Sequence, residues 1–314
     1  MGDNTEGEMM DVQDDVRGVI YTFIGVVLWS ILGIFVRQVP ELSSGLIILY
    51  RFIFASLVLL LYAVVTKRLP MLRVSKSELV RLIIPGVLIA FTIYTYTVGI
   101  KNTTIANTVF LQQLAPIYVL IISYFFLKED ITRRTTLAVL IGITGGFLIL
   151  WYDYGGAVEF GGTHFFGDLV ATASGFGWAT YTIAMRLLGK THEGITSTFW
   201  LFLFAAIITL PFGGTSGMIT GYSLAMLFIM GSFCTALSFI LYNIALRHLE
   251  AAKASVIVLL EGVLSGIWAY LILAEKVNPG TIIGGALIIV ATGIIIQESR
   301  AKPREAPYEE GVIE

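Results

Sequence analysis

Charged side chains are scarce in this chain of 314 residues, at 13% of the total, whereas hydrophobic residues make up 56%. A soluble domain has about 25% charged residues, so this chain has too little charge to cover a surface that faces water. The mean hydropathy of +0.84 agrees with a chain that lies mostly in lipid. The composition therefore excludes a soluble globular protein and predicts an all-α integral membrane protein.

Residue types that support metal, redox or nucleotide chemistry are also rare. Cys234 is the only cysteine, which excludes an intrachain disulfide. The three histidines have no metal-ligand spacing, and neither HExxH nor GxxxxGK[ST] occurs. We therefore expect no cofactor and no metal site. Lysine and arginine are few and lie in short loops, so no nucleic acid partner is expected.

The N-terminal segment, MGDNTEGEMMDVQDDVRG, lacks the basic region, short apolar core and cleavage site of a signal peptide. The first apolar run is therefore expected to be a retained membrane span. Residues 1–16 are acidic and polar, and residues 298–314 are charged and contain two prolines. We predict both segments to be disordered cytoplasmic tails.

Apolar runs of about twenty residues recur along the chain, and each is long enough to cross a bilayer. The predicted ten spans are Gly18–Val36, Gly45–Val65, Leu79–Ile100, Ile105–Leu127, Thr135–Trp151, Gly167–Leu188, Thr196–Phe212, Leu224–Leu246, Ala251–Leu273 and Pro279–Ile296.

Lysine and arginine are distributed unequally between the two sides of the membrane. With a cytoplasmic N-terminus, sixteen of them fall on the cytoplasmic side and three on the opposite side, while Arg51 lies inside the second span. Positive residues concentrate on the cytoplasmic side of membrane proteins. The pattern predicts a multi-pass protein of the cell (plasma) membrane with both termini cytoplasmic.

The chain also repeats itself. Gly18, Trp29 and Arg37 match Gly167, Trp178 and Arg186 at an offset of 149 residues, and seven positions between 96 and 129 match positions between 242 and 275 at an offset of 146. We predict two five-helix repeats, residues 17–151 and 167–297, joined by an external linker at 152–166. Because five is odd, the second copy enters from the other face, which makes this a 5+5 inverted repeat, typical of secondary transporters.

With this layout the sequence resembles the drug/metabolite transporter (DMT) superfamily, in its ten-span EamA-type branch. The first copy contains Leu114-Ala115-Pro116 followed by Leu127-Lys128-Glu129, and the second contains Leu260-Glu261-Gly262 followed by Leu273-Ala274-Glu275. Each pair is followed by a glycine-rich helix, and Tyr50-Arg51-Phe52 also resembles the family. Where the family usually has Glu-Pro, this chain has Glu261-Gly262.

The resemblance implies a bundle with a central cavity lined mainly by spans 1, 3, 4, 6, 8 and 9. The last helix of each copy would pack at the periphery. The substrates of such families are small metabolites such as amino acids, often moved outward.

Two charged residues inside spans are the first candidates for a binding site. Glu261 lies near the middle of the ninth span, where a charge costs several kcal/mol, so it is expected to face a cavity, a partner or water. It would bind a cationic group or carry a coupling proton, or it is a structural carboxylate. Arg51 reaches the interface by snorkelling, or pairs with Glu261 or a solute carboxylate.

Polar and aromatic residues in other spans complete the candidates. Gln112 and Gln113 lie at the depth of Glu261 by the repeat, and serve either a zwitterionic solute or contact between helices. Trp29 and Trp178 occupy matching positions in mid-span, and either stack on a solute or pack in the core. Further candidates on polar helix faces, or alternatively packing residues, are Tyr96, Tyr242 and Asn243.

The sequence therefore predicts a secondary transporter that exports a small organic metabolite, such as an amino acid or amine, by alternating access. Proton coupling would run through Glu261. The alternatives are an intramembrane enzyme, for which no pair of mid-membrane aspartates exists, and a channel-like facilitator. The expected partners are the solute and the lipid bilayer, with the protein as a monomer or homodimer.

Overall fold

A computed structural model describes residues 2–103, 108, 111–129, 131–153, 165–188, 194–213, 218–273 and 279–301. In these ranges the regular structure is helical, without a strand, as expected for an all-α membrane protein. The elements of the first predicted repeat are α1 (Gly2–Ser30), α2 (Leu32–Arg37), α3 (Ser44–Val65), η1 (Leu69–Leu72), α4 (Lys76–Asn102), α6 (Ala115–Ile122), η2 (Ser123–Leu127) and α7 (Arg133–Asp153).

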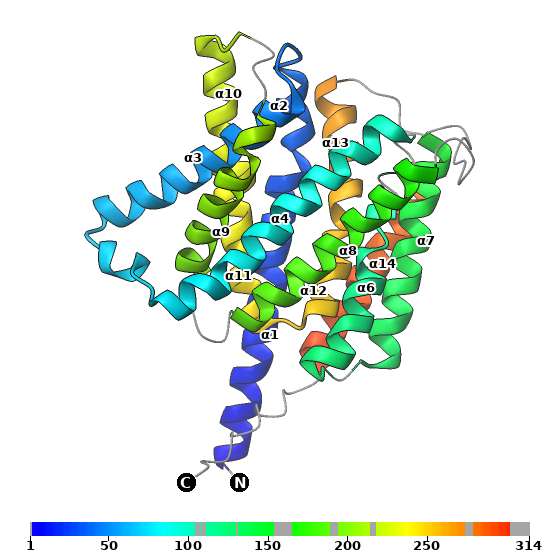
Figure 1. Cartoon of the computed structure of the whole chain (residues 1–314). Coiled ribbons are helices and arrows are strands. Elements are labelled where there is room, and N and C mark those ends of the chain that lie inside the picture. Colours follow the sequence, from blue (N-terminus) through cyan, green and yellow to red (C-terminus); the bar gives the residue numbers. More distant parts are fainter. Residues whose placement is uncertain are drawn as a thin grey trace.

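The second predicted repeat is helical in the same way, and Figure 1 shows all of these helices gathered into one bundle. Its elements are α8 (Phe165–Leu188), α9 (Gly194–Thr209), η4 (Leu210–Phe212), α10 (Gly221–Gly231), η5 (Ser232–Leu237), α11 (Ser238–His248), α12 (Ala251–Val258), α13 (Leu260–Leu273) and α14 (Pro279–Ala301).

Six helical segments are long and apolar enough to cross a membrane, and two shorter apolar helices cover 115–127 and 282–298. The six are Asp15–Val36, Ser44–Val65, Lys76–Gly99, Gly194–Phe212, Gly221–His248 and Ala251–Ile272. Helices α7 and α8 coincide with the predicted fifth and sixth spans. The multi-span membrane class is therefore supported, and the count of ten stays a prediction.

Helix α1 begins well before the apolar residues of the predicted first span. Helix α1 begins at Gly2, so it includes residues 2–16, for which the sequence predicted a disordered tail. Starting a helix is costly, but each further residue adds one hydrogen bond to an existing helix. The polar segment therefore continues the span as a helix. The predicted linker and second tail lie largely outside the described residues.

Two spans are interrupted at matching positions. In the fourth, Leu114 is the N-cap of α6, which carries Pro116 in its first turn, and proline cannot continue a preceding helix. In the ninth, α12 ends at Val258 and α13 begins at Leu260. Helix α6 begins at Ala115 and α13 begins at Leu260, 145 residues apart, which is within one residue of the 146-residue offset of the sequence repeat. Both α6 and α13 therefore begin inside the bundle rather than at a membrane surface.

Helices α7 and α14, which end the two predicted repeats, pack against each other along one edge of the bundle (Figure 1). They approach each other closely at Gly145 and Gly284, where a Cβ on either glycine would lie closer than 3.0 Å to the backbone oxygen of the other. Small residues allow membrane helices this close approach. The glycine-rich last helices thus serve packing.

Candidate functional site

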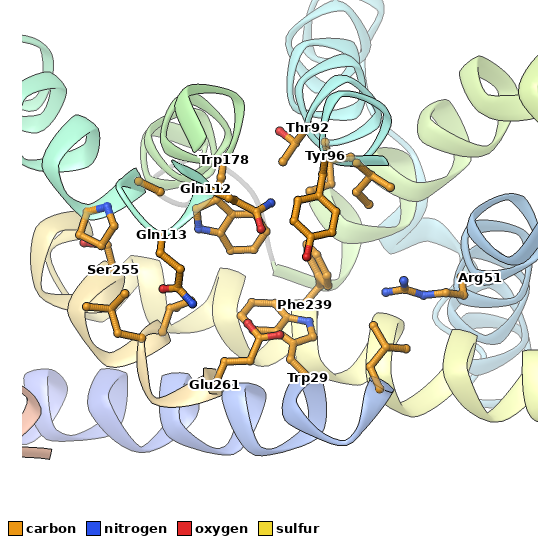
Figure 2. A pocket seen from close by; sticks show the side chains of 17 residues that line it. Trp29, Arg51, Thr92, Tyr96, Gln112, Gln113, Trp178, Phe239, Ser255 and Glu261 are labelled. Atoms are coloured by element: carbon orange, nitrogen blue, oxygen red, sulfur yellow. The ribbon is translucent and has the colours of Figure 1, made fainter. Parts of the chain in front are cut away.

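A cavity of about 210 Å³ lies at the interrupted spans, among α1, α3, α4, α6, α8, α11, α12 and α13. Figure 2 shows that its polar side chains converge from several of these helices. The lining is mainly apolar and aromatic, with a few charged and amide groups. This is the usual composition of a small-molecule site.

Glu261 enters the cavity from the first turn of α13. The N-terminus of a helix carries partial positive charge, which stabilises a carboxylate there. Within the described residues, no hydrogen bond or ion pair is formed by this carboxylate. Gln113 is close by, since its Nε2 lies 3.9 Å from the position that a Cβ on Gly262 would take. The interruption of the ninth span thus presents its carboxylate beside an amide from the fourth.

Arg51 enters from α3 at the opposite end of the cavity from Gln113 (Figure 2). Its Nε donates a hydrogen bond of 3.1 Å to Thr235 Oγ1. Thr235 in turn donates to the Met230 carbonyl over 2.9 Å, within the π-helical turn η5. Within the described chain, no side-chain nitrogen of Arg51 lies within 4.0 Å of a carboxylate oxygen of Glu261. The two opposite charges therefore face one cavity without contacting each other.

Gln112 and Gln113 contribute the two amides of the cavity. In the described part of the chain, neither side chain hydrogen-bonds to protein. A buried polar group without a partner costs about 1–3 kcal/mol. Glu261 and the guanidinium end of Arg51 face the same cavity as the two amides. These four polar side chains thus retain hydrogen-bonding capacity for a bound molecule or water.

An aromatic wall, formed by Trp29, Trp178 and Phe239, closes one side of the cavity. The Trp29 and Trp178 rings meet edge to face with centroids 5.5 Å apart, and the Phe239 ring lies 4.9 Å from Trp29. The two indoles come from matching positions of the sequence repeat. The Trp29 Nε1 is buried and has no hydrogen-bond partner. The wall offers ring faces on which an apolar or cationic group can pack.

The cavity contains most of the candidate residues from the sequence. Tyr242 and Asn243 are fully or almost fully buried and are not part of its lining. The Tyr242 hydroxyl hydrogen-bonds to Thr182 over 3.1 Å, and Asn243 bonds to Tyr181 and Thr198, each over 2.9 Å. These two side chains are satisfied by protein and support the aromatic wall from behind. The seven candidates that do line the cavity are Glu261, Gln112, Gln113, Trp29, Trp178, Tyr96 and Arg51.

Sequence reasoning missed Phe239 and Ser255 as lining residues. Phe239 lies one helical turn before Tyr242 on the same side of α11, and both rings pack on Trp29, but only Phe239 reaches the cavity. Ser255 lies six residues before Glu261 on the same span, and six residues of an uninterrupted helix rotate by about 600°, roughly 120° short of two turns, so helical periodicity alone does not put the two side chains on one face. No polar pattern distinguishes either residue from its neighbours.

The fold and cavity define a polytopic helical membrane protein with an internal polar site, the architecture of a solute carrier. Two consecutive segments, residues 16–151 and 165–297, match the model of the EamA-like transporter family. The chain belongs to the EamA-like transporter family and is a membrane transporter of the drug/metabolite transporter superfamily.

Relatives share this class at low identity. An uncharacterized transporter of Archaeoglobus fulgidus is 26% identical over 88% of this chain and 95% of its own length. An S-adenosylmethionine uptake transporter of Rickettsia bellii is 26% identical over 83% of this chain and 86% of its own length. A solved crystal structure superposes with a TM-score of 0.79 at 19% identity, covering 90% of this chain and 97% of the other. That likeness concerns the fold alone.

Proposed function

We propose that this protein is a secondary transporter that binds a small zwitterionic metabolite, of the amino acid or amine class, in the central cavity. The observation that carries the proposal is the two opposite charges, Glu261 and Arg51, which face one cavity and form no ion pair within the described part of the chain. A buried charge is costly unless it is paired. A solute with an ammonium and a carboxylate group would pair with both at once.

The other groups of the site fit the same solute. Gln112 and Gln113 can donate to a carboxylate and accept from an ammonium group. The indoles of Trp29 and Trp178 provide a face for the remaining side chain or for a cation. The cavity volume of about 210 Å³ is below the usual range of about 300–1,000 Å³ for ligand pockets, which favours a compact solute.

S-adenosylmethionine is the second candidate, because relatives with about 26% identity are named for its uptake. It also carries an amino acid head group, and its sulfonium ion and adenine ring would suit the aromatic wall. S-adenosylmethionine is larger than a simple amino acid, so a cavity of about 210 Å³ favours the amino acid. Competition between it and simple amino acids therefore tests both candidates in one assay.

Alternating access between two inverted five-helix halves is the proposed mechanism. Two findings support it: the family model matches each half separately, and the fourth and ninth spans are interrupted within one residue of the repeat offset. Discontinuous helices at the midplane are typical of secondary transporters. The proposal includes ten spans, cytoplasmic termini, residence in the cell membrane and export of the solute.

The test is uptake and counterflow of radiolabelled amino acids, amines and S-adenosylmethionine in proteoliposomes, with and without a pH gradient. Glu261→Gln should weaken solute affinity by about 10- to 100-fold, because a hydrogen bond to a charged group contributes about 1.5–3 kcal/mol. The matched control is Glu41→Gln, which removes an exposed carboxylate outside the cavity and should leave affinity unchanged.

Four outcomes would contradict parts of the proposal. Equal affinity in Glu261→Gln and wild type would remove the carboxylate from the binding site. Transport without saturation or counterflow would indicate a channel-like facilitator. Loss of pH dependence in Glu261→Gln with unchanged affinity would make this residue a proton carrier instead of a solute ligand. Uptake without efflux in oriented vesicles would reverse the proposed direction.

A further inference from the structure

Two buried ion pairs lie at the end of the bundle that α1 enters. Lys253 Nζ is 3.7 Å from Asp15 Oδ2 and 3.3 Å from Glu250 Oε2, and the Lys253 and Asp15 side chains are only 4% and 6% exposed. Arg186 Nε is 3.2 Å from Glu129 Oε1, with both side chains 9% exposed. Charges this well buried are held by their partners rather than by water.

Backbone groups tie the second pair to two further helices. Arg186 Nη1 donates a short hydrogen bond to the Leu246 carbonyl at the end of α11. Glu129 Oε1 also accepts a hydrogen bond of 3.3 Å from the Ala251 amide, which starts α12. Glu129 thus binds the first amide of α12. The pairs therefore hold several helix ends together.

Each pair joins one predicted half of the protein to the other. Asp15 is on α1 and Glu129 follows η2, and both of these elements are in the first half. Lys253 is on α12 and Arg186 is on α8, both in the second half. Both of these ion pairs between the halves lie at the same end of the bundle.

The ion pairs lie close in sequence to residues that line the cavity. Lys253 precedes the lining residue Ser255 by two positions on α12, a rise of about 3 Å. Arg186 follows the lining residue Trp178 by eight positions on α8, a rise of about 12 Å. A solute that leaves toward this side has to pass the helix ends that the ion pairs join, so these ends would have to move apart.

We propose that Asp15–Lys253 and Glu129–Arg186 form an ionic latch that holds the cavity closed toward the predicted cytoplasmic side. The latch rests on the proposed alternating-access function, because opening this side separates the two halves and therefore both pairs. Rocking of the halves would break the pairs, hydrate the four charges, and expose the cavity floor at Ser255.

The experiment measures access to the cavity floor and uses no solute. The only cysteine, Cys234, is replaced by alanine, and Ser255→Cys provides a single reporter at the floor. A membrane-impermeant methanethiosulfonate is added from either side, in inside-out and right-side-out vesicles. Lys253→Met and Glu129→Gln should each raise labelling from the cytoplasmic side by about tenfold or more, since removing one partner of a buried ion pair strongly destabilises the closed arrangement.

Labelling from the opposite side separates a latch from general loosening. A shift of the two-state equilibrium lowers labelling from the outside while it raises labelling from the inside. A misfolded variant would label faster from both sides, and size-exclusion profiles in detergent would identify it. Lys253→Arg keeps a positive charge that can pair with Asp15, so this variant should be labelled as slowly as the wild type.

The matched control is Glu250→Gln. Glu250 pairs with the same Lys253 but lies in the same half and is 23% exposed, so its loss cuts no link between halves. Its labelling rate should stay within about twofold of the wild type, because a partly exposed pair contributes little. The double variant Glu129→Gln with Arg186→Gln should label more slowly than either single variant, because it leaves no uncompensated charge.

Unchanged labelling in both single variants, or equal effects from Glu250→Gln and Lys253→Met, would overturn the latch. These results do not depend on the transported solute. If labelling responds as expected while no zwitterion is transported, the latch stands and the proposed solute fails. If zwitterions are transported while labelling does not respond, the solute stands and the latch fails.

Discussion

The contact between α7 and α14 gives a sharp prediction about stability. Gly145 and Gly284 face each other so closely that a Cβ on either one would collide with a backbone oxygen, and also with side chains or backbone of the facing helix. A backbone oxygen cannot rotate away as a flexible side chain can. Gly145→Ala or Gly284→Ala must therefore push the two helices apart.

The expected magnitude follows from two opposing effects. Overpacking of a close contact costs about 1–3 kcal/mol, while replacing glycine by alanine inside a helix gains about 0.5–1 kcal/mol. Gly146 and Gly293 lie on the same two helices, and a Cβ there would meet nothing within 4 Å. Gly146→Ala and Gly293→Ala should thus be neutral or stabilising, and the test and control variants should differ by about 2 kcal/mol.

The assay is unfolding by sodium dodecyl sulfate in mixed micelles, followed by tryptophan fluorescence, with the midpoint compared among the four variants. The double variant Gly145→Ala with Gly284→Ala should lose less than the sum of the single losses, since both act on one contact. If Gly145→Ala unfolded at the same midpoint as Gly146→Ala, the close approach of α7 and α14 would be refuted.

Two further predictions concern single side chains. Thr235→Val removes the acceptor for the Arg51 Nε, so Arg51 is no longer held in place and affinity for a carboxylate solute should fall about tenfold, measured as Kd by scintillation proximity; unchanged affinity would mean that Arg51 orients itself. Burial raises the pKa of the Glu129 carboxyl, although Arg186 and the Ala251 amide lower it. Its stabilising contribution is therefore fully present below the unfolded pKa of about 4.3 and is lost as pH rises through the higher folded pKa. The apparent melting temperature should fall across that window, and Glu129→Gln should flatten the fall.

Composition and periodicity predicted the membrane class because transfer of apolar helices into lipid depends on local sequence alone. The same logic placed Glu261, Gln112 and Gln113 at a cavity: polar groups within an apolar span are costly unless they face one.

The lining residue of the eighth span could not be predicted from periodicity, because Phe239 and Tyr242 are one helical turn apart on α11 and both pack on Trp29 and Trp178. Only the folded bundle shows that Phe239 reaches the cavity, whereas Tyr242 is buried behind the aromatic wall. The ion pairs of Lys253 and Arg186 join residues far apart in the chain, and only the folded bundle shows which charges meet.

The three kinds of contact in the cavity come from unrelated positions around it: a guanidinium from α3, a carboxylate from α13 and an indole from α1. A solute whose charged groups bind Arg51 and Glu261 has one remaining direction in which its side chain meets Trp29. Its mirror image, held by the same charges, directs that side chain away from the indole. The cavity therefore has a handedness, and we expect the carrier to distinguish L- from D-enantiomers of its solute.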